Sequence, residues 1–258
     1  MSTVRLERDG AVAIVTLDRP DNANVLHLEM GRALRETVHQ LEQDASVRAV
    51  VLTGAGKHFC FGGDLRGMVT GGADIEPYLR ELTDDLHAAI VGFVHLEAPV
   101  IAAVSGTAAG AGVGLVAMAD LAVAGEGSRF SLAYTGVALT PDGSTSFFLP
   151  RLVGRKRAME LLLTPRAFTA AEALEWGFVN QVVTDAEVHE TALQWARQLA
   201  CGPRHAFAKT KRLLAPSRQE LEFHLALEGR TIAGQAASAE GAEGIRAFLE
   251  KRRPSFPG

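Results

Sequence analysis

Two glycine-rich segments are the parts of the sequence best suited to bind a ligand through main-chain atoms. The first, residues 54–66, has the pair Gly62-Gly63 directly before Asp64, and the second, residues 105–114, has glycine at positions 110, 112 and 114. Each follows a short apolar run typical of a buried strand. Glycine lets a backbone turn sharply and approach a ligand closely, and N–H groups at the start of a helix attract negative charge.

Together the two segments predict an oxyanion hole. If their strands are neighbours in a sheet, one N–H from each segment could bind the same carbonyl oxygen. Phosphate binding fits less well, because a P-loop needs Ser or Thr after its lysine, and His58 follows Lys57 here. A dinucleotide fingerprint is incomplete, since Gly114 stands one residue too early. Taken singly, each segment also fits a tight turn or close helix–sheet packing.

The flanking sequence predicts alternating strands and helices up to about residue 125, which is typical of an α/β fold. Expected strands are 4–6, 11–17, 47–53, 100–104 and 121–124; expected helices are 26–41, 78–96 and 110–118; a glycine-rich loop is expected at 57–72. After residue 155 helical spacing dominates, over 156–163, 170–176, 186–201, 204–214, 218–238 and 240–252, with a short strand at 179–183. We therefore expect an α/β core at residues 1–200 and a helical region at 201–258.

The composition excludes several classes of protein. The 258 residues include 26 Lys+Arg and 30 Asp+Glu, and this net charge of -4 argues against nucleic acid as a partner. Apolar residues make up 47% and charged residues 22%, which is ordinary for a globular chain and not for a disordered one. Glycines interrupt the longest apolar stretch, residues 100–125, so no membrane span is expected. Two cysteines and a polar N-terminus lead us to expect a cytoplasmic protein.

Several motifs spread over nearly the whole chain carry a family resemblance. They are Asp18–Asn24, Phe59–Leu65, Ala98–Gly112, Leu139–Gly143, Leu149–Gly154, Ala170–Val179 and Ala247–Lys251. In these segments the sequence resembles the crotonase (enoyl-CoA hydratase/isomerase) superfamily. The resemblance implies a ββα spiral core with a C-terminal helical trimerisation region, assembly as a homotrimer or homohexamer, and an acyl-CoA thioester as substrate. It implies no separate cofactor, because coenzyme A is part of the substrate.

The resemblance also assigns candidate site residues. It gives the oxyanion-hole donors as the N–H groups of Gly63 and Ala111. The other candidate substrate-binding residues are Ala23, Asp64, Leu65, Arg66 and Tyr134. Among them, Ala23 and its loop would line the nucleotide end, and Arg66 would meet the CoA phosphates or pantetheine. No metal site is expected, since the histidines are scattered without paired ligand spacing.

The expected reaction follows from one acid. Hydratases of this family use two glutamates, which would stand at Gly114 and Tyr134, and neither position has a carboxylate. By the resemblance, Asp142 falls where some isomerases and aromatic-pathway members of the family have their single Asp or Glu, and its flanking sequence resembles the branch with the phenylacetate-pathway isomerases. Pro-Asp-Gly is also an ordinary turn signal. We therefore predict an enoyl-CoA double-bond isomerase in which Asp142 is the acid/base. Apolar walls would raise the basicity of its carboxylate, and the expected walls are Phe61, Met68, Tyr134, Val137, Leu139, Phe147 and Phe148.

Three alternatives stay open from the sequence. A hydratase-like reaction is the first. The second is a hydrolytic dehalogenase of the 4-chlorobenzoyl-CoA type, in which Asp142 would be a nucleophile and His87 would activate water. Two observations weaken this alternative. The preferred interpretation of His87 is an exposed helix residue, and the tryptophan that such a dehalogenase would have at position 134 is replaced by Tyr134. The third is a non-catalytic acyl-CoA-binding protein with Asp142 in a turn.

Overall fold

A six-stranded sheet is the frame of the molecule in the computed structural model, which describes residues 3–70, 74–164 and 166–256. Its strands follow the order β1 (Val4–Asp9), β2 (Val12–Leu17), β3 (Ala49–Gly54), β4 (Val100–Val104), β6 (Leu121–Gly125) and β9 (Gln181–Val183). β1 and β2 form an antiparallel hairpin, and the remaining neighbours are parallel. Gly10 makes the hairpin turn with φ +58°, a conformation that glycine adopts readily.

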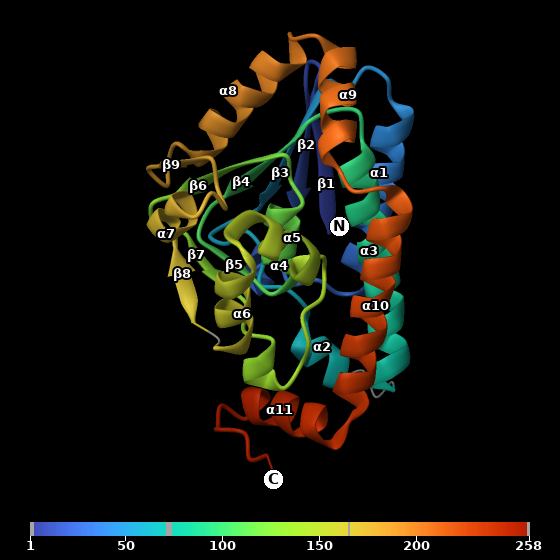
Figure 1. Cartoon of the computed structure of the whole chain (residues 1–258), viewed down its shortest axis with the longest axis vertical. Coiled ribbons are helices and arrows are strands. Elements are labelled where there is room, and N and C mark those ends of the chain that lie inside the picture. Colours follow the sequence, from blue (N-terminus) through green and yellow to red (C-terminus); the bar gives the residue numbers. More distant parts are fainter. Residues whose placement is uncertain (1–2, 71–73, 165, 257–258) are drawn as a thin grey trace.

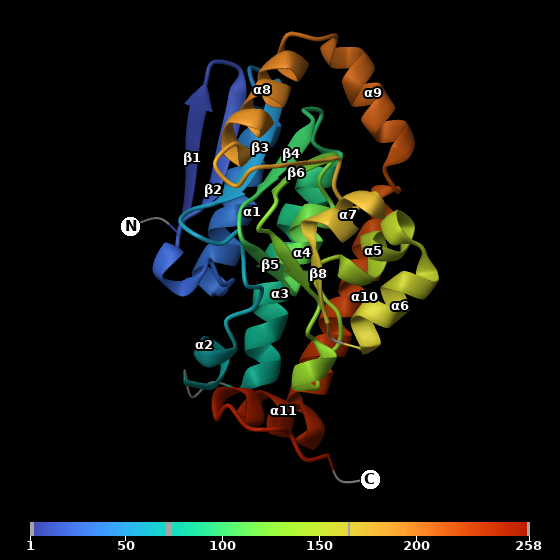
Figure 2. The same ribbon diagram turned by 90° about the vertical axis from the view of Figure 1, so that its left-hand side faces the viewer.

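A smaller sheet and the helices surround this frame (Figures 1 and 2). The smaller sheet has the order β5 (Thr107–Ala109), β7 (Arg129–Ser131) and β8 (Ala167–Thr169). The helices are α1 (Leu28–Gln43), α2 (Leu65–Thr70), α3 (Ile75–His95), α4 (Ala111–Ala117), α5 (Thr145–Val153), α6 (Arg155–Leu163), α7 (Ala170–Glu175), α8 (Val188–Ala200), α9 (Arg204–Leu214), α10 (Arg218–Ala237) and α11 (Ala239–Leu249). Figure 1 shows α10 running beside α3, and the two helices pack against each other.

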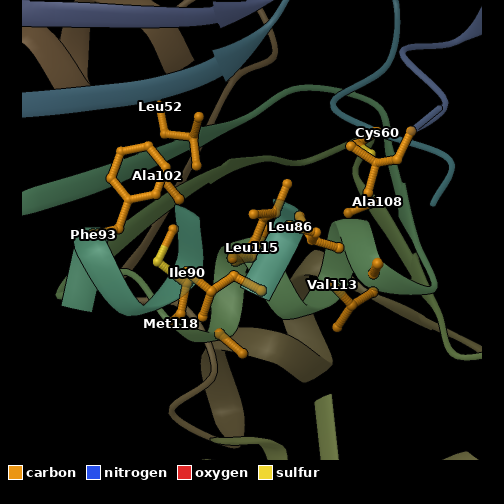
Figure 3. Packing of buried hydrophobic residues seen from close by; sticks show 14 of the residues in the cluster. Leu52, Cys60, Leu86, Ile90, Phe93, Ala102, Ala108, Val113, Leu115 and Met118 are labelled. Carbon is orange, nitrogen blue, oxygen red and sulfur yellow. The ribbon is translucent and has the colours of Figure 1, made fainter. Parts of the chain in front are cut away.

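The two faces of the large sheet are buried under different helices. Along β3, Val50 and Leu52 belong to the main core with α1 and α3, whereas Ala49 and Val51 pack with α8 on the opposite face. This burial on both faces explains why the parallel strands are continuous apolar runs. Figure 3 shows part of the main core, where Phe93 of α3 lies near Leu52 of β3 and Ala102 of β4, and Ile90 lies near Met118. The site is therefore built over a rigid, fully packed interior.

The expected α/β class and the order of the main strands and helices are confirmed, with boundaries displaced by a few residues. One local expectation is wrong: residues 57–72 are not all loop, because Leu65–Thr70 form α2. Asp64 stabilises the start of this helix by accepting a hydrogen bond from the Gly67 N–H at 3.0 Å. The last two residues of the expected loop, Gly71 and Gly72, lie outside the described part of the chain.

Candidate active site

The two glycine-rich segments meet beyond the carboxyl ends of β3 and β4, which are neighbouring parallel strands. The Ala109 N–H donates to the Cys60 carbonyl at 2.8 Å, so the segments run side by side. A Cβ on Gly62 would lie 2.8 Å from the Ala109 carbonyl oxygen and 3.3 Å from the Ala111 nitrogen. Gly62 also has φ +77°. Only glycine therefore allows this close approach without strain.

The two candidate oxyanion donors share one cavity. Gly63 and Ala111 both line it, and among the described residues no protein acceptor takes the N–H of either. Ala111 is the first residue of α4, so its N–H belongs to the helix start, where the peptide dipoles favour a negative ligand. Gly63 is fixed from the other side by Leu26, which bonds to the backbone of Gly62 and Asp64 at 2.7 and 2.8 Å.

The cavity is small and apolar, with one carboxyl group in its wall. Its volume is about 40 Å³, and its lining residues are Leu26, Gly63, Met68, Leu79, Leu82, Thr83, Leu86, Ala111, Tyr134, Asp142 and Ile232. The Met68 side chain lies over Gly63 and is a flexible group that can move for a ligand. A larger surface cleft of about 680 Å³ lies between α1, α3 and α10, but it contains neither donor.

Asp142 occupies the turn that leads into α5. Its backbone carbonyl accepts hydrogen bonds from the Tyr134 hydroxyl at 2.7 Å and the Thr145 hydroxyl at 2.8 Å. Burial and the nearby Asp142 charge raise the pKa of Tyr134 well above its usual value, so its hydroxyl stays a donor. Asp142 is thus a turn residue, as one interpretation of the sequence allowed, and it also lines the cavity.

His87 is the main correction to the sequence analysis. The preferred interpretation made it an exposed residue of α3, yet its side chain is only 10% exposed and its Nε2 lies 2.9 Å from Oδ1 of Asp142. Burial by itself lowers the pKa of His87. The charge of Asp142 and its hydrogen bond outweigh burial and raise that pKa overall, so the imidazolium is favoured beside the carboxylate.

Sequence reasoning missed Glu228 on α10. Its carboxylate is buried and accepts hydrogen bonds from the N–H groups of Ser144 and Ser146 at 2.8 and 2.9 Å. Burial and the Asp142 charge raise the pKa of Glu228 to about 7. No local motif marks this residue, because it lies 86 positions after Asp142 in a helix of ordinary composition.

His87, Asp142 and Glu228 could also be considered as metal ligands. One donor atom from each lies within 4.8 Å of the others. These donor atoms are already engaged, because Nε2 of His87 bonds to Asp142 and both Glu228 oxygens accept hydrogen bonds from the backbone. The arrangement therefore fits a hydrogen-bonded proton-transfer group better than a metal centre, and the absence of a metal stays a prediction.

The remaining candidate residues adjoin the first glycine-rich segment and do not line the cavity. The Ala23 carbonyl accepts a hydrogen bond from the Phe61 N–H at 3.1 Å, which joins the Ala23 loop to the first glycine-rich segment. Asp64 forms an ion pair with Arg19 at 3.7 Å and bonds to Gly67, so it stabilises its own segment. Leu65 and Arg66 begin α2, and Arg66 is exposed.

The structure shows which of the expected wall residues line the cavity and why position 114 has no side chain. Met68 and Tyr134 line the cavity, whereas the other five expected wall residues do not, and Phe61 is 41% exposed. A Cβ on Gly114 would lie 1.8 Å from the Gly143 carbonyl oxygen. A side chain at position 114 is therefore excluded by the turn that contains Asp142.

A family comparison agrees with this geometry. The model of the enoyl-CoA hydratase/isomerase family (ECH_1) matches residues 7–258. The chain belongs to the enoyl-CoA hydratase/isomerase family. A crystal structure of an enoyl-CoA hydratase from Mycobacterium avium subsp. paratuberculosis K-10 matches all of both chains with a TM-score of 0.89 and 31% identity. The crotonase fold that the sequence predicted is thereby confirmed, and the protein is an acyl-CoA enzyme of this family.

Curated relatives in this family have several names. A "Probable enoyl-CoA hydratase" from Rhodobacter capsulatus is 39% identical over 99% of this chain and 98% of the relative. The 1,2-epoxyphenylacetyl-CoA isomerase of Escherichia coli is 37% identical, over 96% of this chain and 95% of the relative. A 4-chlorobenzoyl coenzyme A dehalogenase from an Arthrobacter species is 35% identical, over 98% of this chain and 92% of the relative. These relatives share the family, but their names describe three different reactions: hydration, isomerisation and dehalogenation.

Within the described residues, the helices are all too short or too polar to cross a bilayer.

Proposed function

We propose that this protein is an enoyl-CoA double-bond isomerase in which Asp142 is the acid/base. The observation that supports the proposal is one cavity lined by Asp142 together with Gly63 and Ala111. A carboxylate that faces two free main-chain donors can remove a proton next to a thioester while the donors bind the developing charge. Positions 114 and 134, where a hydratase would have its glutamates, have no carboxylate.

The proposed reaction needs a single base. Asp142 removes a proton from the α carbon of a 3-enoyl thioester, and the electron pair of that C–H bond moves into a dienolate. The N–H groups of Gly63 and Ala111 stabilise the negative charge on the thioester oxygen. Asp142 then returns the proton to the γ carbon, which gives the conjugated 2-enoyl thioester. Apolar neighbours such as Leu86 and Ile232 exclude water from the cavity, so hydration does not compete.

A direct assay tests the proposal. The enzyme is mixed with 3-enoyl-CoA thioesters of different chain lengths and one aryl-substituted thioester, and the ultraviolet absorbance of the conjugated product is followed. Wild type is expected to form the 2-enoyl product, and Asp142→Ala is expected to form none. Asp84→Ala is the matched control, because Asp84 is an exposed acid on α3 that does not line the cavity. Equal activity in wild type and Asp142→Ala would contradict the proposal.

One contact favours a second candidate, a hydrolytic substitution on a halobenzoyl-CoA. The Nε2–Oδ1 hydrogen bond places His87 beside Asp142, where it could activate water after Asp142 had attacked the ring and released halide. Halide release from 4-chlorobenzoyl-CoA, with a covalent aryl ester accumulating in His87→Gln, would support this candidate. Release of no halide, combined with isomerase activity, would exclude it.

A further inference from the structure

The long helix α10 brings a second carboxylate to the side of the cavity where Asp142 lies. Glu228 contacts the turn that follows Asp142, and one of its oxygens lies within 4.8 Å of donor atoms of Asp142 and His87. One helical turn further along α10, Ile232 lines the acyl cavity itself. This helix therefore contributes to the site within the same chain, in addition to any contact it makes with another subunit.

The turn after Asp142 needs to be held in place. Gly143 and Ser144 both have a left-handed backbone, with φ +64° and φ +69°, and this conformation is unfavourable for serine. Glu228 accepts hydrogen bonds from the Ser144 and Ser146 N–H groups and from the Ser146 hydroxyl. These bonds satisfy N–H groups at the start of α5 that have no partner within the helix. A single buried carboxylate thus fixes the strained turn that carries Asp142.

We propose that Glu228 is a positioning residue for the reaction: it holds the turn that orients the Asp142 carboxylate, and its charge acts on the Asp142–His87 pair. This role rests on the proposed isomerase function. It is distinct from a catalytic role, because Glu228 does not line the acyl cavity. The Glu228 charge is buried and lies close to the pair, since one oxygen or nitrogen atom of each of the three residues lies within 4.8 Å of the others.

The groups around Glu228 define how its charge responds to pH. Asp142 faces it from the turn, His87 from α3, and His224 from its own helix, with 3.7 Å between His224 Nε2 and a Glu228 oxygen. Burial and the Asp142 charge raise the pKa of Glu228 to about 7, while the bonds from Ser146 and Ser144 lower it. Glu228 therefore gains its charge as the pH rises through neutrality. The charge strengthens the hydrogen bonds that Glu228 accepts from Ser144 and Ser146, so the turn that carries Asp142 is held more firmly and turnover should rise over the same range.

The first test compares the pH dependence of kcat for isomerisation in wild type and Glu228→Gln. Wild type should show a rise in kcat near pH 7. Glu228→Gln should lose that rise and remain near the acidic plateau of wild type at every pH. Isotope-edited infrared spectroscopy of the glutamate carboxylates provides a readout that does not depend on activity. It should show one carboxylate that titrates near neutrality in wild type and is missing from the variant.

Ser146→Ala is the decisive second variant, because it keeps Glu228 and removes only the hydroxyl donor. Loss of a donor to a carboxylate raises its pKa, so the inflection should move to higher pH while the upper plateau is preserved. The Ser146 hydroxyl contacts Glu228 and His224 but not His87, so the titration of His87 would not produce this shift. Ser217→Ala, at the exposed cap of the same helix, serves as the control and should leave the inflection in place.

The outcomes separate the two proposals. If both Glu228→Gln and Ser146→Ala lower kcat by a constant factor at all pH values, the role of the Glu228 charge is wrong and the isomerase function stands. If no carboxylate titrates near neutrality in the infrared spectra, the role of the charge is also wrong. If wild type isomerises no enoyl thioester, both proposals are overturned.

Discussion

The two sides of the cavity that Gly63, Ala111 and Asp142 line are built by different means. The donor side consists of main-chain N–H groups from two glycine-rich segments at the ends of adjacent strands. The acid side consists of side chains from a turn, from α3 and from α10, which are separated by 55 and 86 positions in the sequence. A main-chain site is specified by local sequence, because glycine and strand position determine it. A side-chain cluster exists only after distant helices have packed.

The largest expected effect tests the acid side. Asp142→Asn keeps the size of the side chain and removes its ability to accept a proton, so turnover should fall by about 10²–10⁴-fold. Affinity for the CoA thioester should stay near that of wild type, because the donor side is intact. Steady-state kinetics together with calorimetric binding measures both quantities. An unchanged rate would remove Asp142 from the mechanism.

The next effect tests the donor side. Ala111→Pro removes one N–H, and proline is well tolerated at the first position of a helix such as α4. Loss of one donor should lower kcat by about 10²–10³-fold. Ala111→Gly, which retains the N–H, is the matched control and should keep most of the activity. Equal activity in the proline and glycine variants would show that this N–H does not bind the thioester oxygen.

The buried Glu228 carboxyl group should make the free energy of unfolding depend on pH. The pKa of Glu228 rises from the ordinary value of 4.5 to about 7, so the folded state holds this proton more tightly than the unfolded chain. Its contribution to stability is therefore complete below pH 4.5 and is lost as the pH rises through 7, at about 1.4 kcal/mol per pKa unit.

Chemical denaturation over this pH range, compared between wild type and Glu228→Gln, measures the contribution. The difference in free energy between the two proteins should change with pH in the stated direction. A difference that does not depend on pH would contradict the assigned pKa.

A fourth variant distinguishes structural charges from functional ones. Lys211 on α9 bonds to Asp120 at 2.6 Å and to the carbonyls of Phe93 and Ala98. Lys211→Met removes the cation paired with Asp120, which keeps its hydrogen bond from the Val100 N–H, and should lower the free energy of unfolding by about 1 kcal/mol. Activity below the unfolding transition should be unchanged, because the pair lies outside the cavity. Lys209→Met, at an exposed position of the same helix, should alter neither property.

For removal of metal ions we expect no effect on activity. Dialysis against a strong chelator should leave activity intact, because hydrogen bonds already engage the donor atoms of His87, Asp142 and Glu228. Loss of activity that a divalent cation restores would instead identify these three residues as a metal site.

Much of the architecture could be predicted from the sequence. The Asp9-Gly10 hairpin and the parallel strands that follow correspond to local apolar patterns and turn signals. The short strands β5, β7 and β8 were missed, because three residues carry too little periodicity to identify a strand. Helix α2 was missed because its glycine and polar residues resemble the loop before it.

The sequence alone determined the class of fold, the two donor segments and the lack of a carboxylate at positions 114 and 134, since each of these depends on residues close together in the chain. The burial of His87 against Asp142, and the place of Glu228 beside them, depend instead on how distant segments pack. The physical reason is that the side of a helix a residue faces depends on what packs there. α10 covers the face of α3 that carries His87, and no pattern within α3 could specify that neighbour.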